Sequence, residues 1–314
     1  MRISNSEIQT FKRCKRKWYF NYYLGLKRNI ESAAGAAPIG TRLHSCLDVY
    51  YKYKLDGLTD MDAQNAAMVQ HEYLAYMDVE QGRVAEDDKK FLSEVDLTRI
   101  MLIGYFDWLA ESGADEGLTV VAAERAIEVD TEVEGYGPVT IMGKLDLLLH
   151  RELDDANLFI DHKSVMELTT PAKWLHLNEQ FKMYDWLLRR YSVHTRSDGG
   201  MFNLLRKVKR TARANPPFYG RLEVRHSDAE LASFEQTLGG EIRDIMALRT
   251  ALDSGDPAGP LSRIYPTPTS DCSWQCPYFQ VCPMVDRADG SASRVIELTM
   301  HRGDPYERYD NPEG

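Results

Sequence analysis

The sequence predicts a mixed α/β fold of the α+β type, in which a mixed central sheet is flanked by helices. Helical periodicity fills most of the first 111 residues, extended apolar segments begin at Leu118, and helices and strands then follow one another. With 314 residues the chain can bury a full core, and its 43% hydrophobic and 27% charged residues are ordinary for a globular protein.

The N-terminal third is expected to be helical. Ser4 and Glu7 form the pattern of a capping box, so a first helix should begin near residue 5, carry Cys14 and end at Gly25. After a loop of small residues, apolar side chains recur at intervals of three and four. This spacing predicts helices over residues 40–54, 61–78 and 88–111.

The middle of the chain should form the sheet. Strands are expected over residues 118–124, 126–133, 139–150, 158–164, 199–205 and 220–226. Thr170 and Pro171 predict the start of a helix that reaches about Tyr191, and Ser227 and Glu230 predict the cap of another. A proline-rich segment, residues 256–268, then leads to three cysteines.

Strand alternation places two carboxylates and a lysine together. Alternate side chains of a strand face the same way, so Asp161 and Lys163 share one face. Asp146 lies on the preceding strand, and antiparallel pairing would bring it beside them. Two carboxylates can hold a divalent metal, and a lysine can position or deprotonate water or stabilise developing charge. An isolated Asp-x-Lys is common on exposed strands, so neighbouring residues decide its meaning.

Three further side chains are candidates for the same site. Gln180 and Tyr184 lie four residues apart on a predicted helix, so both can reach a substrate phosphate or Lys163. His44 is a metal ligand by type, although a lone histidine on a helix is more often structural.

Four of the five cysteines suggest a metal or cluster site. Cys272, Cys276 and Cys282 lie within eleven residues, and Cys14 stands among basic residues that favour a thiolate. An iron–sulfur cluster, a zinc ion and unligated core thiols all remain open, with three clustered cysteines and a remote one more typical of a cluster. Cys46 is left over.

The charge of the chain is unevenly distributed. The net charge of −10 argues against nucleic-acid binding when taken alone, but two long stretches are basic and free of acids. These stretches predict a DNA-binding surface or, alternatively, solvated helix faces and loops. The basic residues proposed for DNA are Lys12, Lys15, Arg206, Lys207, Lys209 and Arg210. The rings of Trp18, Tyr19 and Tyr22 could stack on unpaired bases or pack in the core.

Over roughly residues 1–285, the ordered set of motifs resembles the PD-(D/E)XK nuclease superfamily. The motifs are CKRKWYFNYY, GTRLH, GKLD, DHK, QFKMY and the C-terminal cysteine triplet. More narrowly, the set resembles the iron–sulfur branch, which includes the RecB and AddB nuclease domains, CRISPR-associated exonucleases and phage-encoded relatives.

The resemblance implies a restriction-endonuclease-like core with defined site residues. It implies Mg²⁺ or Mn²⁺ on His44, Asp146 and Asp161, catalysis by Lys163 with Gln180 and Tyr184 lining the site, and a [4Fe–4S] cluster on Cys14, Cys272, Cys276 and Cys282. Glu124 stands where some relatives carry an extra acidic residue, or it faces solvent. Two departures from the family pattern are Lys15, where proline is common, and the three-residue spacing between Cys272 and Cys276.

The expected organisation is one domain over residues 1–285 and an acidic tail over 286–314. The domain would hold a helical insertion (55–115), a catalytic sheet core (118–225) and a cysteine cluster (270–285) joined to Cys14. With no apolar run of eighteen residues and no signal-peptide pattern, a cytoplasmic location is expected.

The implied activity is metal-dependent exonuclease action on DNA ends, with single-stranded ends expected, in recombination, repair or phage DNA processing. A catalytically silent DNA-binding or assembly protein, and a nuclease that trims spacers in CRISPR adaptation beside a protein partner, are the alternatives. No phosphate-binding Gly-x4-Gly-Lys-Ser/Thr loop is present, so the chain is not an ATP-driven helicase by itself.

Overall fold

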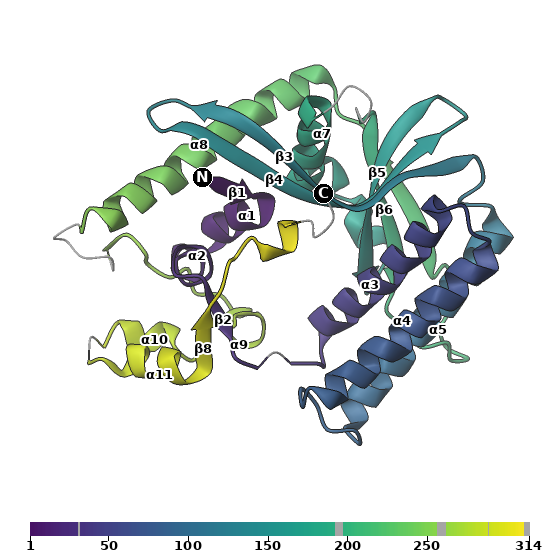
Figure 1. Cartoon of the computed structure of the whole chain (residues 1–314), viewed down its shortest axis with the longest axis horizontal. Helices are drawn as coiled ribbons and strands as arrows, with labels where there is room; N and C mark the ends of the chain where they lie inside the picture. The colour runs from purple at the N-terminus through teal and green to yellow at the C-terminus, as the bar shows by residue number, and fades with distance from the viewer. Residues whose placement is uncertain (31, 192–196, 256–261, 288, 311–314) are drawn as a thin grey trace. The chain divides into compact units, whose positions relative to one another are not determined.

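The computed structural model describes residues 1–30, 32–191, 197–255, 262–287 and 289–310. These residues cluster into two compact units, which are described one at a time. The first unit comprises residues 1–31, 128–143 and 232–314, and the second comprises 32–127 and 144–231. The boundary falls within two paired strands, β3 (Leu118–Val133) and β4 (Gly137–Arg151) (Figure 1). A single domain over residues 1–285 stays a prediction.

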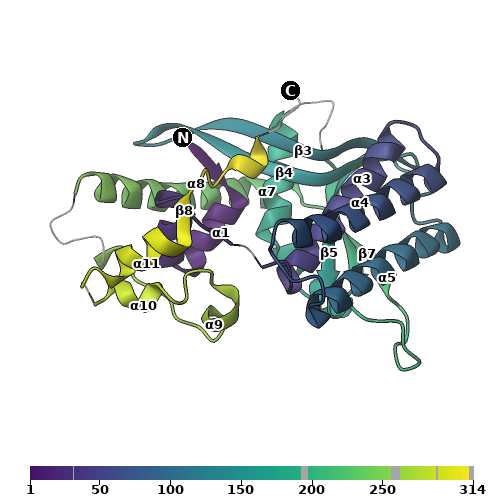
Figure 2. The same ribbon diagram turned by 60° about the horizontal axis from the view of Figure 1, so that its bottom comes forward.

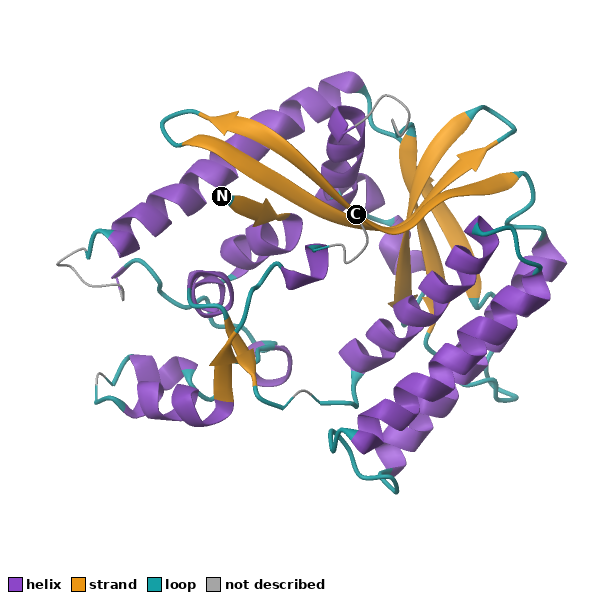
Figure 3. Ribbon diagram, viewed as in Figure 1, coloured by secondary structure: helices purple, strands orange, loops and turns teal. Residues whose placement is uncertain are grey.

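Within the described residues, six strands form a mixed sheet, which confirms the predicted fold class (Figure 3). Its order is β1-β4-β5-β6-β7, and β3 also pairs with β4. The other strands are β1 (Arg2–Ser4), β5 (Ala156–Val165), β6 (Gly199–Arg206) and β7 (Tyr219–Val224). The β4–β5 and β6–β7 pairs are antiparallel, whereas β1–β4 and β5–β6 are parallel.

In the second unit, helices cover both faces of the sheet. The helices α3, α4 and α5 lie side by side in Figures 1 and 2, and an apolar core joins them to β4, β5, β6 and β7. Their bounds are α3 (Ala36–Leu55), α4 (Asp60–Glu80) and α5 (Lys89–Ser112). On the other face, Phe181 of α7 (Glu179–Tyr191) packs against Phe159 and Phe202, with ring centroids 5.0 and 4.4 Å away.

The single helix expected from Thr170 to Tyr191 was wrong. Two short segments, α6 (Thr169–Ala172) and η2 (Leu175–Leu177), precede α7. Trp174 leaves the helical region with φ −141° and ψ 18°. The Asn178 side chain then accepts the N–H of Phe181 at 3.2 Å, as an N-cap does, so α7 begins anew at Glu179.

The sequence predicts that Cys14 lies within the first helix, and this prediction is wrong. Cys14 is extended, with φ −162° and ψ 111°, and separates α1 (Asn5–Arg13) from α2 (Lys15–Trp18). A π-helical turn, η1 (Tyr19–Tyr23), follows, and Gly25 ends the helical run with φ +64°. The predicted stop at Gly25 is therefore confirmed, since glycine adopts this conformation without steric cost.

The segment after residue 286 packs into the first unit. It contains α11 (Ser291–Thr299), β8 (Met300–Arg302) and η5 (Glu307–Tyr309). The strand β8 pairs antiparallel with β2 (Leu26–Arg28), and a Cβ atom added at Gly25 would lie 2.5 Å from the carbonyl oxygen of Gly303. This close approach explains why glycine is needed at residue 25.

Between residues 232 and 285, the first unit contains helices. Its long helix is α8 (Asp228–Asp253), capped by Ser227 and Glu230 as predicted, and α9 (Cys272–Gln275) and α10 (Cys282–Val285) carry cysteines. Among the helices described in either unit, none is both long and apolar enough to span a membrane.

Candidate active site

The two predicted carboxylates lie at the same end of the β4–β5 pair. The ladder runs from Arg151↔Ala156 to Leu147↔Ile160, so Asp146 and Asp161 are the next residues on the two strands. At this point the Asp146 carboxylate accepts the backbone N–H of His162 at 2.8 Å. The two carboxylates come from neighbouring strands that pair antiparallel, as predicted.

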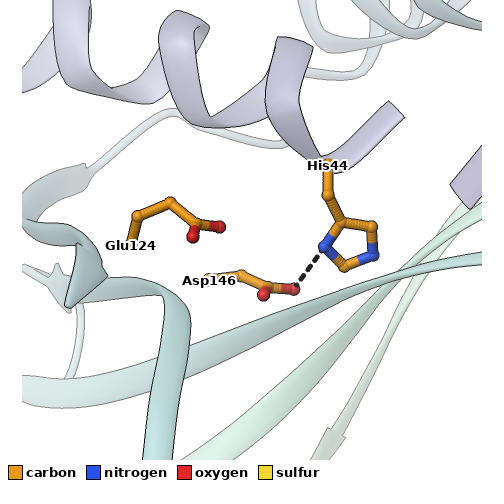
Figure 4. Close-up of side chains that lie close together, drawn as sticks. All are labelled: His44, Glu124 and Asp146. Atoms are coloured by element: carbon orange, nitrogen blue, oxygen red, sulfur yellow. Dashed lines mark ion pairs between the residues drawn. The ribbon is translucent and has the colours of Figure 1, made fainter. Parts of the chain in front are cut away.

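A histidine and a second acidic residue approach Asp146 from other elements. His44 of α3 places Nδ1 3.2 Å from Asp146 Oδ2, and Glu124 of β3 points toward the same space (Figure 4). One ligand atom from each of these three residues lies within 4.8 Å of the other two. The structure therefore brings together His44, Glu124 and Asp146, of which Glu124 was the most uncertain candidate.

Glu124 owes its position to an unusual backbone. Its φ of +50° lies in the left-handed region, which costs a non-glycine residue roughly 1 kcal/mol. Within β3, Glu124 Oε2 pairs with Lys144 Nζ at 2.7 Å. Strained residues of this kind gather at functional sites, which supports a role for Glu124 beyond a solvent-facing strand position.

Asp161 is held by a separate set of contacts. Lys163 Nζ lies 2.8 Å from Asp161 Oδ2, and Gln180 Nε2 donates to Asp161 Oδ1 at 3.0 Å. Gln180 also donates to the hydroxyl of Tyr184, which in turn donates to the carbonyl oxygen of Lys144 at 2.8 Å. Gln180 and Tyr184 thus contact Asp161 and the β4 backbone.

Burial separates the acidities of the two aspartates. Burial raises the pKa of Asp161 to about 6, and the neighbouring charge of Asp146 adds to the rise while Lys163 opposes it. Burial also disfavours ionised Asp146, but the hydrogen bond and charge of His44 outweigh this effect, so the pKa of Asp146 is lowered. Two carboxylates in one site therefore differ in how readily each ionises.

The cationic groups respond to the same carboxylates. Burial favours neutral Lys163, yet Asp161 outweighs it, and the pKa of Lys163 is raised. Likewise, burial opposes the charging of His44, but Asp146 raises its pKa. Lys163 is therefore a stable ammonium at neutral pH, which suits charge stabilisation and water positioning better than proton abstraction.

The donor set fits a hard divalent cation. Carboxylate oxygens with one imidazole suit Mg²⁺ or Mn²⁺. Asp161 is almost fully buried, and its Oδ2 lies 2.8 Å from the ammonium of Lys163. Buried carboxylates are paired or coordinate metals, and the position of Asp161 beside Asp146 allows both. His44, Glu124, Asp146 and Asp161 are the residues that could hold such a metal.

Asp48 is an acidic neighbour that sequence reasoning missed. It lies on α3 four residues after His44 and therefore on the same helix face, and its Oδ1 is buried without a hydrogen-bond partner. Burial raises the pKa of Asp48, and its charge acts on Glu124 and Asp146. The i, i+4 spacing from His44 was the signal that could have found it.

His162 was also missed, although it lies between Asp161 and Lys163. Its ring faces the opposite side of β5, stacks on Tyr51 at 5.7 Å, and has Nδ1 2.8 Å from Asn203 Nδ2. Burial lowers the pKa of His162 to about 3, so the ring is neutral. This packing supports the strand segment whose N–H holds Asp146.

Most of the basic residues predicted to bind DNA already have partners within the protein. Lys12 pairs with Glu241 at 2.6 Å, and Lys209 approaches Asp96 at 3.7 Å. Lys15 lies over the rings of Phe11 and Tyr265. Arg206 donates to the backbone carbonyls of Met166 and Asn215. Arg210 donates to the carbonyl oxygen of Val208 and the hydroxyl of Tyr219, and it lies over the ring of Phe218. Within the described residues, the Lys207 side chain forms no ion pair.

The rings considered for base stacking are largely buried. Trp18 is fully buried and its indole Nε1 donates to Glu7 at 2.9 Å, while Tyr22 is 8% exposed. Tyr19 is half-buried and stacks on Tyr23 at 5.3 Å. For Trp18 and Tyr22 the core-packing interpretation was correct, because stacking needs an exposed ring face.

The four predicted cysteine ligands belong to the first unit. Each is half-buried, and the charge of Cys14 acts on Cys276 and Cys282 while that of Cys272 acts on Cys276. Burial raises the pKa of Cys276 and of Cys282, and Arg16 opposes the rise at Cys282. Cys46 is fully buried in the apolar core of the second unit.

The fold, the paired acids and the adjacent lysine define a protein suited to metal-assisted hydrolysis of phosphate esters. The sequence profile of the PD-(D/E)XK nuclease superfamily matches residues 2–283. The chain therefore belongs to this superfamily, which implies a nuclease that acts on nucleic acid. A search of curated proteins found no match.

Proposed function

We propose that the protein is a Mg²⁺- or Mn²⁺-dependent deoxyribonuclease that degrades DNA from its ends, with single-stranded DNA as the preferred substrate. The carrying observation is that Asp146, Asp161 and Lys163 meet at one end of the β4–β5 pair, with His44 and Glu124 beside Asp146. Recombination, repair or phage DNA processing would use such an activity.

Each site residue has a defined task in this proposal. A bound divalent ion supplies positive charge that lowers the pKa of water and neutralises the phosphate. His44, Glu124, Asp146 and Asp161 offer the ligand atoms. Lys163 presents an ammonium beside Asp161, where it can orient the attacking water and stabilise charge on the phosphate.

Positioning residues complete the arrangement. Gln180 binds Asp161 Oδ1 and leaves Oδ2 toward Lys163, and Tyr184 ties Gln180 to the β4 backbone at Lys144. Because Gln180 and Tyr184 lie on α7, packing of this helix against the sheet sets the angle of the Asp161 carboxylate.

The direct test uses end-labelled single-stranded and duplex DNA with the purified protein. Release of labelled products in Mn²⁺ or Mg²⁺, with none in EDTA or in Ca²⁺, is the expected result. Ca²⁺ prefers a looser coordination that does not align in-line attack. Activity that persists in EDTA, or equally in Lys163→Ala, would point to a contaminant. Tight DNA binding by a wild type that cleaves no substrate would favour a catalytically silent binding protein.

We also propose that Cys14, Cys272, Cys276 and Cys282 hold a structural [4Fe–4S] cluster. Three cysteines close together in the sequence and a fourth far from them are more typical of a cluster than of zinc, which usually has two short Cys-x2-Cys pairs. The structure supports the grouping, since the charge of Cys14 acts on Cys276 and Cys282.

Anaerobic purification provides the test of the cluster. We expect iron and labile sulfide in cluster stoichiometry, lost in Cys14→Ser, and retained in Cys46→Ala because Cys46 lies in an apolar core. Stoichiometric zinc without sulfide would refute the cluster. Loss of iron in Cys46→Ala but not in Cys14→Ser would refute the ligand assignment.

A further inference from the structure

The connection between the two halves of the active site exposes large apolar side chains. It runs from the end of β5, which carries Lys163, to the start of α7, which carries Gln180. Within it, Met166 is 69% exposed, Trp174 59% and Leu177 60%. Among the described residues, the apolar clusters around α3–α5 and around β2 and β8 do not include these three side chains. Exposed apolar groups beside a catalytic residue indicate a surface that contacts a ligand.

Part of this connection is hollowed. A cavity of about 290 Å³ is lined by Val165, Met166, Glu167, Thr170 and Pro171. Val165 lies two residues beyond Lys163 on β5, so both side chains share one face about 7 Å apart along the strand. A group bound in the hollow would therefore lie close to a phosphate that contacts Lys163.

The charges around the hollow favour different parts of a nucleotide inside and outside it. The backbone N–H of Lys207 donates to the carbonyl oxygen of Val165 at 2.7 Å, which sets this basic residue beside the hollow. Glu167, by contrast, contributes a carboxylate to the lining itself, and a carboxylate repels phosphate. Phosphates are therefore favoured outside the hollow, near Lys163 and Lys207, and an uncharged aromatic group within it.

We propose that this hollow, defined by Val165, Met166, Glu167, Thr170 and Pro171, binds one unpaired nucleobase of the strand being cut. Trp174 is the neighbouring exposed ring on which this base would stack, because its backbone N–H donates to the carbonyl oxygen of Pro171, a lining residue, at 3.4 Å. A base in a duplex is stacked and paired, so it cannot enter without being extruded. This inference rests on the proposed nuclease function and assigns its preference for single strands to named residues.

The test measures binding of fluorescent oligonucleotides in EDTA by anisotropy, followed by cleavage in Mn²⁺. Trp174→Ala should weaken single-strand binding about tenfold, since stacking on an aromatic ring contributes at that level, and leave duplex binding unchanged. Met166→Ala gives a second, milder variant if Trp174→Ala fails to fold. Leu153→Ala is the matched control, because Leu153 is 91% exposed on the β4–β5 turn away from the hollow.

A double-mutant cycle locates the base. An abasic residue next to the cleaved phosphate should weaken single-strand binding by wild type as much as Trp174→Ala weakens binding of the intact strand. The two changes together should weaken binding little more than either change alone. Additive effects, or no effect of either change in a wild type that cleaves DNA, would overturn the hollow while leaving the nuclease proposal intact. A wild type that cleaves nothing would refute the proposed function itself.

Discussion

Two buried carboxylates, Glu7 in the first unit and Asp161 in the second, differ in their hydrogen-bond partners. Glu7 accepts hydrogen bonds from the indole of Trp18 at 2.9 Å, from Arg249 at 2.8 Å and from the hydroxyl of Tyr306. Asp161 accepts one hydrogen bond at Oδ1, from Gln180, and its Oδ2 lies 2.8 Å from the ammonium of Lys163. Three donors from the fold satisfy Glu7, whereas Asp161 has two partners and lies beside the acidic groups that could hold a cation.

Exchanging each carboxylate for its amide should separate catalysis from stability. We expect Asp161→Asn to lower the single-turnover cleavage rate about a thousandfold, because it removes a charge that acts in the transition state. Glu7→Gln should keep the rate but lower the free energy of unfolding by about 3 kcal/mol, since Arg249 loses its charged partner. Lys163→Ala is the parallel catalytic variant, with circular dichroism as the check on folding. A retained rate in Asp161→Asn would contradict the site assignment.

The second prediction concerns stability without metal. The pKa of Asp161 is about 6 in the folded protein, against about 3.9 for an ordinary aspartate. The folded state therefore holds the proton more tightly, and wild type loses stability as the pH rises from about 4 to 6. In EDTA at pH 8, Asp161→Asn should be more stable than wild type by about 3 kcal/mol, and the advantage should vanish below about pH 4.

Denaturant unfolding across this pH range measures the effect. Mn²⁺ should reverse the order at pH 8, because it binds the carboxylate of wild type and not the amide. A difference that is independent of pH, or equal stabilisation of both proteins by Mn²⁺, would mean that Asp161 neither carries the raised pKa nor contacts metal.

A smaller effect is expected from the hydroxyl that supports Gln180. Tyr184→Phe keeps the ring packed against Phe159 but removes the bond to the Lys144 carbonyl. We expect about a tenfold lower rate and little change in stability, as for a group that orients another. Tyr306→Phe, which removes a hydrogen bond to Glu7, should lower the stability and leave the cleavage rate unchanged. Equal effects of both variants on the cleavage rate would remove the distinction between the two regions.

The smallest effect should be seen in the salt dependence of DNA binding. Lys207→Ala should reduce the slope of log K against log salt concentration by about 1, the loss of one phosphate contact. Lys12→Ala should change it less, because Lys12 already pairs with Glu241. Identical slopes for wild type and Lys207→Ala would place the DNA elsewhere.

The grouping of Asp146, Asp161 and Lys163 was predictable because its geometry is local. Asp161 and Lys163 share a face through the two-residue period of a strand, and Asp146 precedes a short turn that sets the register. Helix signals were also local, as at the Ser227–Glu230 cap and the Gly25 stop. The helix from Thr170 failed because the Asn178 cap competes with helix continuation.

The sequence by itself determined the order of elements, the acidic pair with its lysine, and the superfamily, since all of these depend on neighbours along the chain. Only the tertiary structure decided which candidates meet. Glu124, in a left-handed conformation, lies near His44 and Asp146. Trp18 is buried whereas Trp174 is exposed, and Lys12 pairs with Glu241. Such outcomes depend on long-range packing, because burial and charge pairing are properties of surfaces that form only when distant segments come together.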